Sequence, residues 1–208
     1  MTKIKICGLK RLEDITYVNK YLPDYIGFIF AKSKRMVDDA TASQLKRALD
    51  KRIKAVGVFV NEPIEHITAL CRENVIDLVQ LHGDEEETYI KELKQRIPNE
   101  IIKAIRLKEA LGPEDIQKFS CSHILFDTYN KEQYGGSGLT FNLELIPENM
   151  NSFFLAGGLK AENILKVIEE CHPYCVDISS GVETNGIKDE IKIKELIELV
   201  RNQNKAEY

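Results

Sequence analysis

The stretch "KIKICGLKRLED", residues 3–14, decides between two folds. Its first five residues alternate in polarity and include two isoleucines, which is typical of a β-strand. Directly after this strand the chain has one glycine, Gly8, and no G-x-G-x-x-G pattern. An open, doubly wound sheet of the Rossmann type carries that pattern after its first strand. The stretch therefore favours the other architecture made of repeated β/α units, the closed (β/α)8 barrel.

Seven further runs rich in β-branched and aromatic residues follow this strand, with room for a helix and two loops between successive runs. They begin near residues 24, 53, 77, 100, 122, 151 and 174. Most gaps show helical periodicity, carried by Leu12, Ile15, Val18 and Leu22, by Leu45, Ala48 and Leu49, by Tyr89, Ile90, Leu93 and Ile97, and by Ile193, Leu196, Ile197 and Val200. Strands that are apolar on both faces and alternate with one-sided helices indicate a parallel sheet covered by helices. We therefore expect an α/β protein, a (β/α)8 TIM barrel that forms a single domain over residues 1–208.

Composition and charge argue against several classes of partner. Of the 208 residues, 43% are hydrophobic and 30% are charged, which is the balance of a soluble globular protein. The net charge is −4 and no basic block is present, so we expect no nucleic-acid partner. No apolar run approaches the roughly 20 residues of a membrane span. We therefore expect no membrane partner and a cytoplasmic location.

The five cysteines, at positions 7, 71, 121, 171 and 175, are odd in number and irregularly spaced. This pattern argues against a disulfide framework and indicates free thiols in a reducing compartment. The cluster of Cys171, His172 and Cys175 could suggest a metal ion, but it lacks a second ligand pair at zinc-site spacing and contains Pro173. We expect packing roles for these residues and no metal site.

Polar residues end several of the predicted strands. In a (β/α)8 barrel the active site lies at the carboxyl ends of the strands, so these residues are the first candidates for it. They are Cys7, Gln80 with His82, Arg106, Asp127 and Asp177. The loop after the sixth strand, residues 128–140, is polar and glycine-rich and has no helical period. Such a loop predicts a functional role.

Two short loops after the seventh and eighth strands predict a phosphate site. They read "AGGL" at 156–159 and "SSGVE" at 179–183. Small residues expose backbone N–H groups, which is how a barrel holds a phosphate. Either loop alone is equally compatible with ordinary turns and helix caps, but both together, on adjacent strands, favour phosphate. The candidate phosphate-binding residues are Gly157, Gly158, Ser179, Ser180 and Gly181.

Cys7 and Asp127 form a candidate pair of base and acid. The first and sixth strands are not neighbours in the barrel, so their ends can face each other across the mouth with a small sugar between them. A thiol becomes a usable base when its thiolate is favoured locally, and a carboxyl among apolar neighbours holds its proton to higher pH. For Cys7 the alternative is a buried small hydrophobic residue, as most free cysteines are.

The residues alone do not decide the roles of Arg35 and His82. Arg35 follows the second strand, and its planar fork of donors suits a carboxylate. Its alternative is a solvated basic loop shared with Lys32 and Lys34. His82 either takes part in acid–base chemistry or ligand binding, or shapes the mouth of the barrel.

Taken together, these features resemble one known family, the phosphoribosylanthranilate isomerases of tryptophan biosynthesis. The resemblance extends over essentially the whole chain, with motifs in order at barrel spacing. They read "KICG" at 5–8, "GFIF" at 27–30, "SKR" at 33–35, "GVFVN" at 57–61, "VQLHGDE" at 79–85, "DTYNKEQYGGSG" at 127–138, "LAGGL" at 155–159 and "VDISSGVETNGIKD" at 176–189.

The resemblance implies an Amadori rearrangement of N-(5'-phosphoribosyl)anthranilate to 1-(2-carboxyphenylamino)-1-deoxyribulose 5-phosphate, without a cofactor. Asp127 is then the general acid that protonates the ring oxygen, and Cys7 is the general base that takes the C2' proton. Arg35 would hold the anthranilate carboxylate, although Lys34 precedes it where the family usually has proline. Further substrate contacts are expected from Gln80, His82 and Asp177.

Two alternatives remain. The first is another phosphoribosyl-binding barrel isomerase; the histidine-pathway enzyme has paired aspartates at the ends of strands one and five, where this chain has Cys7 and Arg106. The second is a non-catalytic barrel that binds a phosphorylated ligand, which would not need both Cys7 and Asp127. We expect the partner to be a small phosphoribosyl molecule and the protein to be a monomer, with a homodimer as the alternative.

Overall fold

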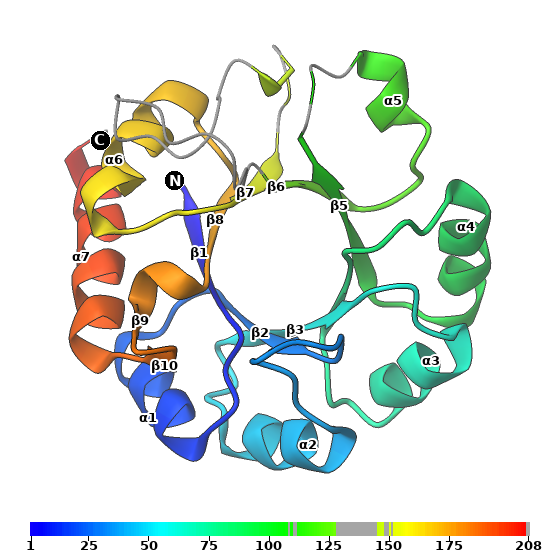
Figure 1. Cartoon of the computed structure of the whole chain (residues 1–208), viewed down its shortest axis with the longest axis horizontal. Coiled ribbons are helices and arrows are strands. Elements are labelled where there is room, and N and C mark those ends of the chain that lie inside the picture. Colours follow the sequence, from blue (N-terminus) through cyan, green and yellow to red (C-terminus); the bar gives the residue numbers. More distant parts are fainter. Residues whose placement is uncertain (108, 110–111, 128–144, 148–149, 151, 207–208) are drawn as a thin grey trace.

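Eight parallel strands close into a barrel in the computed structural model, which describes residues 1–107, 109, 112–127, 145–147, 150 and 152–206. Each strand pairs with the next one in sequence, and the last pairs with the first. Figure 1 looks into this ring, with the helices outside it. The strands are β1 Lys3–Cys7, β2 Tyr25–Ile29, β3 Lys54–Phe59, β4 Leu78–Leu81, β5 Glu100–Arg106, β6 His123–Asp127, β7 Phe153–Ala156 and β8 Cys175–Ile178. The predicted α/β barrel is confirmed.

Helices cover the outside of the barrel. They are α1 Leu12–Tyr21, α2 Asp39–Ala48, α3 Ile64–Arg72, α4 Glu87–Arg96, α5 Pro113–Gln117, α6 Ala161–Cys171 and α7 Glu190–Ala206. After β8 the chain adds a short 3-10 helix, η2 Ser180–Val182, and a small hairpin of β9 Glu183–Thr184 and β10 Ile187–Lys188. The predicted functional loop of residues 128–140 lies outside the described residues. None of the described helices is long and apolar enough to cross a membrane.

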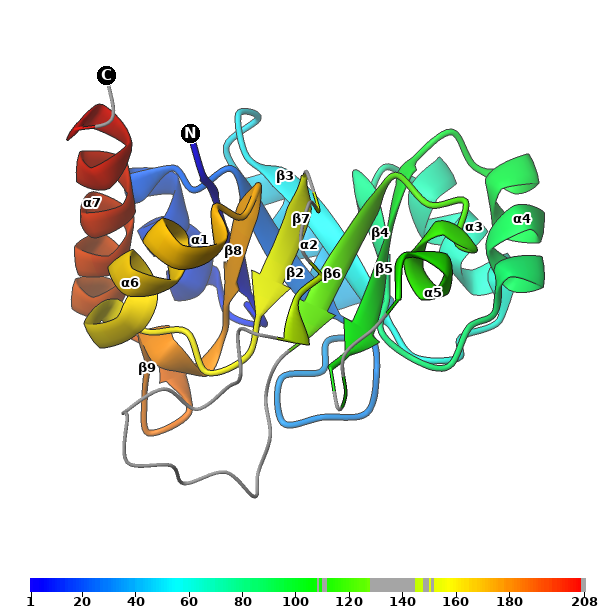
Figure 2. The ribbon, with the colours of Figure 1, turned by 90° about the horizontal axis from the view of Figure 1, so that it is seen from above.

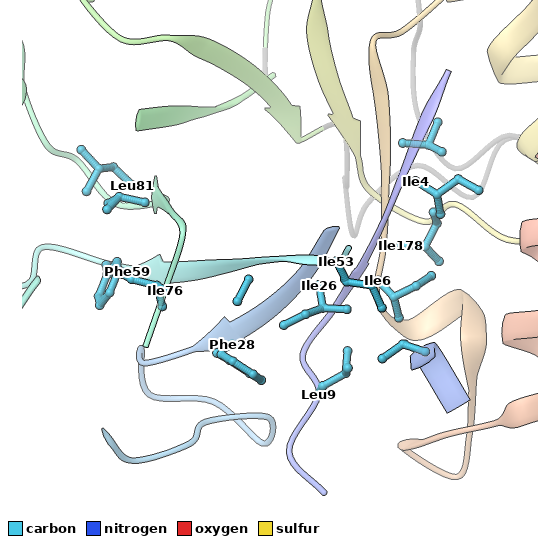
Figure 3. Close-up of a cluster of buried hydrophobic side chains, with 14 of the residues drawn as sticks. Ile4, Ile6, Leu9, Ile26, Phe28, Ile53, Phe59, Ile76, Leu81 and Ile178 are labelled. Atoms are coloured by element: carbon cyan, nitrogen blue, oxygen red, sulfur yellow. The ribbon is translucent and has the colours of Figure 1, made fainter. Parts of the chain in front are cut away.

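The alternation of β1 separates two cores. Ile4 and Ile6 belong to the large cluster between the strands and the helices, part of which Figure 3 shows. Lys5 and Cys7 lie on the opposite face of the strand, inside the barrel. A smaller cluster fills that interior below them, formed by Tyr25, Val56, Leu78, Ile102, Ala104, Leu125, Phe154, Ala156 and Cys175. Each fully buried large apolar side chain contributes about 1.5–3 kcal/mol, so both cores stabilise the fold.

Two of the residues that carry the helical periodicity lie in helices as expected but are exposed. Leu12 is 46% exposed, and Ala48 is also exposed. Leu12 is the first residue of α1 and Ala48 the last of α2, whereas the buried residues of both helices lie further inside them. In α2 the buried positions are Ala42 and Leu45.

The carboxyl ends of the strands gather at one end of the barrel. Figure 2 shows this end at its lower edge, with the loop between β2 and α2 and the hairpin of β9 and β10 beside it. Gly8 lets the chain turn away after β1, because its φ of +82° is a conformation that side-chain-bearing residues rarely adopt. As a result, Cys7 is left at the mouth as the last residue of β1.

Candidate active site

One cavity of about 600 Å³ opens at the carboxyl ends of the strands. It brings together almost all residues that the sequence predicted for the site, although they come from six strands and their loops. Those that line it are Cys7, Arg35, Gln80, His82, Asp127, Gly157, Gly158, Asp177, Ser179 and Ser180. Arg106, another predicted strand end, lies on a neighbouring cavity instead.

Gly181 does not line this cavity. A β-carbon on Gly181 would lie 1.9 Å from the backbone oxygen of Leu159, so the residue allows the loop after β8 to pack against the loop after β7. Ser179 also ties loops together, because its hydroxyl donates a hydrogen bond to the backbone oxygen of Cys7 at 3.1 Å. Gly157 and Gly158 both have positive φ, which fits the tight turn after β7.

The Cys7 thiol is buried at the base of the cavity and closely enclosed. A β-carbon on Gly27 of the neighbouring strand would lie 2.6 Å from Cys7 Sγ, so glycine at this position makes space for the thiol. Burial raises the pKa of Cys7, although the charges of Lys5 and Lys188 act in the opposite direction. Burial therefore favours the thiol form of Cys7 over the thiolate.

Asp127 is the last residue of β6 and shares this cavity with Cys7. Its Oδ2 lies 3.1 Å from His82 Nε2, and His82 Nδ1 lies 2.9 Å from the amide nitrogen of Gln80. The strands that bear Cys7 and Asp127 are not paired with each other. An acid and a base can therefore act on different atoms of one ligand held between them.

Arg35 is held by a carboxylate of the protein itself. Its Nε and Nη2 each donate to one oxygen of Glu183 at 2.7 Å, and Lys188 Nζ also donates to Glu183 at 2.7 Å. Although burial opposes it, the hydrogen bonds from Arg35 and Lys188 lower the pKa of Glu183 to about 2. This ion pair fixes the guanidinium at the rim of the cavity, where Lys32 and Ser33 also lie.

Three charged residues of the site were missed by the sequence reasoning: Lys5, Glu183 and Lys188. Lys5 is fully buried, and its Nζ donates to Gln80 Oε1 at 2.6 Å and to Asp177 Oδ2 at 2.7 Å. A signal for Lys5 was present, because it lies two residues before Cys7 and so on the same face of a strand that is buried on both faces. In the described part of the chain, Asp177 Oδ1 is a buried acceptor without a hydrogen-bond partner.

No group of three or more histidine, cysteine or acidic side chains among the described residues could hold a metal ion. Cys171 ends α6 on the outside of the barrel, whereas Cys175 belongs to the interior core. The two thiols therefore lie in different layers of the fold.

A closed parallel barrel that gathers a thiol, a carboxyl and two glycine–serine loops around one cavity defines a class, the (β/α)8-barrel enzymes that act on small molecules. Residues 4–199 match the family model described as N-(5'phosphoribosyl)anthranilate (PRA) isomerase. The chain belongs to this family of isomerases.

Similar proteins of known name agree with this assignment. The N-(5'-phosphoribosyl)anthranilate isomerase of Endomicrobium trichonymphae is 50% identical over 202 residues, which cover 97% of this chain and all (100%) of that protein. A crystal structure of phosphoribosyl anthranilate isomerase in complex with reduced 1-(o-carboxyphenylamino)-1-deoxyribulose 5-phosphate is 31% identical, with a TM-score of 0.79 over 97% of this chain and 100% of that one. A crystal structure of monomers of the dimeric enzyme from Thermotoga maritima is 32% identical, with a TM-score of 0.77 over 97% of this chain and 99% of that one.

Proposed function

We propose that this protein catalyses the Amadori rearrangement of N-(5'-phosphoribosyl)anthranilate in tryptophan biosynthesis, with Asp127 as general acid and Cys7 as general base. The observation that carries these two roles is that a thiol and a carboxyl from unpaired strands share one cavity of about 600 Å³. Membership of the isomerase family supports the reaction. The residue roles follow from chemistry and geometry.

In the first step, Asp127 gives its proton to the ring oxygen of the ribose as the bond between C1' and that oxygen breaks. The lone pair of the anthranilate nitrogen forms the C1'=N bond of a Schiff base. Cys7 first loses its thiol proton to solvent, and the resulting thiolate removes the proton from C2'. The electron pair of that C2'–H bond then forms an enolamine that tautomerises to the ketone. The burial that raises the pKa of Cys7 makes its thiolate a stronger base once it has formed.

Substrate binding is assigned to the rim and the loops of the cavity. The backbone of Gly157, Gly158 and Ser180 surrounds the space where the phosphate would lie. Asp177 has an unpaired buried oxygen that can accept a hydrogen bond from a ribose hydroxyl. Arg35 has five N–H donors, and Glu183 accepts hydrogen bonds from Nε and Nη2. The remaining N–H groups can donate to the anthranilate carboxylate.

The direct test of the reaction is to add purified protein to freshly made N-(5'-phosphoribosyl)anthranilate and follow the loss of its fluorescence. We expect enzyme-dependent conversion to the deoxyribulose product, identified by mass and retention time against a chemical standard. A non-catalytic barrel would bind the compound without converting it, and this result would reject the proposal.

The role of Arg35 is tested by the Arg35→Ala variant. We expect it to weaken the binding of reduced 1-(2-carboxyphenylamino)-1-deoxyribulose 5-phosphate by about 10-fold or more, because a charge-assisted hydrogen bond contributes about 1.5–3 kcal/mol. Binding of ribose 5-phosphate, which has no carboxylate, should change much less. Lys34→Ala is the matched control, since it removes an exposed cation from the same loop. Equal losses for the two ligands in Arg35→Ala count against the assigned role.

We also propose that residues 1–208 form one domain that acts as a monomer. Among the described residues, few large apolar side chains are strongly exposed, namely Met1, Leu12, Met36, Val60, Ile187 and Ile191. Light scattering of the purified protein should give a mass near 23.8 kDa. Twice that mass would instead indicate a homodimer.

A further inference from the structure

A chain of hydrogen bonds crosses the floor of the active site from Asp177 to Asp127. Lys5 Nζ lies 2.7 Å from Asp177 Oδ2 and 2.6 Å from Gln80 Oε1. From the other end of the same amide, Gln80 Nε2 lies 2.9 Å from His82 Nδ1, and His82 Nε2 lies 3.1 Å from Asp127 Oδ2. All four links join side chains at or next to the carboxyl ends of β1, β4, β6 and β8.

Lys5 fixes the direction of the first links. An ammonium group donates hydrogen bonds and cannot accept them, so the group of Gln80 that faces Lys5 must be its oxygen. Although burial works to lower it, the charge of Asp177 leaves the pKa of Lys5 above its ordinary value, so Lys5 stays an ammonium. Reversing the amide of Gln80 would place an NH2 group against that ammonium and leave two donors facing each other.

The amide of Gln80 then fixes the tautomer of His82. Because Gln80 presents its NH2 group to His82, Nδ1 must act as the acceptor and carry no proton. The proton of the neutral imidazole therefore lies on Nε2, where it is donated to Asp127 Oδ2. The donor-only nature of Lys5 sets this polarity at Nδ1, and the Asp127 oxygen that faces Nε2 is the acceptor for the proton there.

We propose that Lys5 and Gln80 are positioning residues that hold His82 in its Nε2–H tautomer, so that His82 stabilises the carboxylate of Asp127 as Asp127 gives up its proton. This inference rests on the proposed role of Asp127 as general acid. In this inference Gln80 and His82 support the general acid Asp127, whereas the sequence had predicted that they contact the substrate. The His82 hydrogen bond strengthens as negative charge develops on Asp127, which lowers the barrier of ring opening.

The tautomer is measured directly by two-dimensional ¹H–¹⁵N NMR of the histidine rings. The chain has four histidines, so the spectrum is small, and His82→Asn identifies the signals of His82. For the wild-type protein at pH 8 we expect an unprotonated Nδ1 and a protonated Nε2. A protonated Nδ1 in the neutral ring overturns the inference.

Two variants test the origin of the tautomer. Gln80→Glu places a carboxylate oxygen opposite Nδ1, so we expect a proton on Nδ1. Lys5→Met frees the amide of Gln80 to rotate, and we expect a mixture of both tautomers. Lys3→Met is the matched control. Lys3 lies two residues before Lys5 on the same strand, and its Nζ donates to the Tyr25 hydroxyl instead of to Gln80 or Asp177. A wild-type signature in both variants overturns the inference; if Lys5→Met does not fold, Gln80→Glu alone decides.

Kinetics separate positioning from substrate binding. Gln80→Glu should lower kcat about 10-fold, since it weakens a general acid that contributes about 10²–10⁴ in rate, and KM should stay within about twofold. A large rise in KM at unchanged kcat would assign Gln80 to the substrate and overturn the inference. The NMR measurement needs no substrate. An inactive wild-type protein with the expected tautomer would therefore reject the proposed function alone, and normal turnover with the opposite tautomer would reject this inference alone.

Discussion

At the scale of single residues, the site depends on how each ionisable group is surrounded. Cys7 and Asp127 were predicted as candidates because they end strands of a recognisable barrel, and both line the cavity. The sequence carried a signal for the burial of Lys5, which lies two residues before Cys7 on the same face of the strand, but it carried none for the partners of Lys5. The importance of Lys5 comes from Gln80 and Asp177, which lie 75 and 172 residues away in the sequence. Long-range pairing of this kind leaves no local pattern.

The surroundings of Cys7 lead to a prediction about its titration. Burial raises the pKa of Cys7 above its ordinary value of 9.0, whereas the cation of Lys188 lowers it. Alkylation of Cys7 by iodoacetamide, followed by peptide mass spectrometry, should therefore increase with pH to a midpoint above 9.0. Lys188→Met removes a cation and should move this midpoint still higher.

The control for this titration is Lys103→Met. Lys103 is also a buried lysine, but it pairs with Glu85 on the outer face of β5, so its loss should leave the midpoint of Cys7 unchanged. A midpoint below 9.0 in the wild-type protein would contradict the direction of the pKa shift.

At the scale of elements, each strand was predicted within about two residues of its observed start, because period and length identify buried strands well. Burial at the helix ends was less evident, as the exposed residues Leu12 and Ala48 show, since the apolar pattern does not reveal which turns of a helix pack on the core. The packing roles of individual glycines could not be predicted from the sequence either. Gly181 looked like part of a phosphate loop, yet it also allows two loops to pack closely.

Gly27 of β2 gives a prediction at this scale. In Gly27→Ala the added methyl group would lie 2.6 Å from Cys7 Sγ and displace the thiol. We expect kcat/KM to fall about 100-fold, since a misplacement of about 1 Å can cost that much, and circular dichroism should show an intact barrel.

Gly57→Ala is the matched control. Its added methyl group would meet Phe59 and Ile76 on the outer face of β3, at 2.7–2.8 Å, and not the thiol. It should lower thermal stability while kcat stays within about twofold of wild type, because the active site is left intact. If both variants lose activity in proportion to their stability, the enclosure of Cys7 has no role of its own.

At the scale of the whole molecule, closure of the barrel is what makes the site. β1 and β6 are far apart in sequence and do not pair, yet the ring places their last residues on one cavity. Arg35 from the loop after β2 and Glu183 from the hairpin after β8 meet for the same reason. The barrel topology inferred from the sequence predicted that Cys7 and Asp127 meet at one mouth, whereas the ion pair of Arg35 depends on side-chain geometry that the sequence does not show.

The proposed pairing of base and acid is tested most directly by the turnover of freshly made N-(5'-phosphoribosyl)anthranilate in the Cys7→Ala and Asp127→Asn variants. The turnover rate of each variant should fall about 10²- to 10⁴-fold below that of the wild type, because each variant lacks one positioned acid or base. Both should keep the melting temperature of a folded barrel, and Cys171→Ala, which changes a thiol of α6 away from the cavity, should keep full activity. Substantial turnover by either Cys7→Ala or Asp127→Asn would contradict the pairing of base and acid across the barrel mouth.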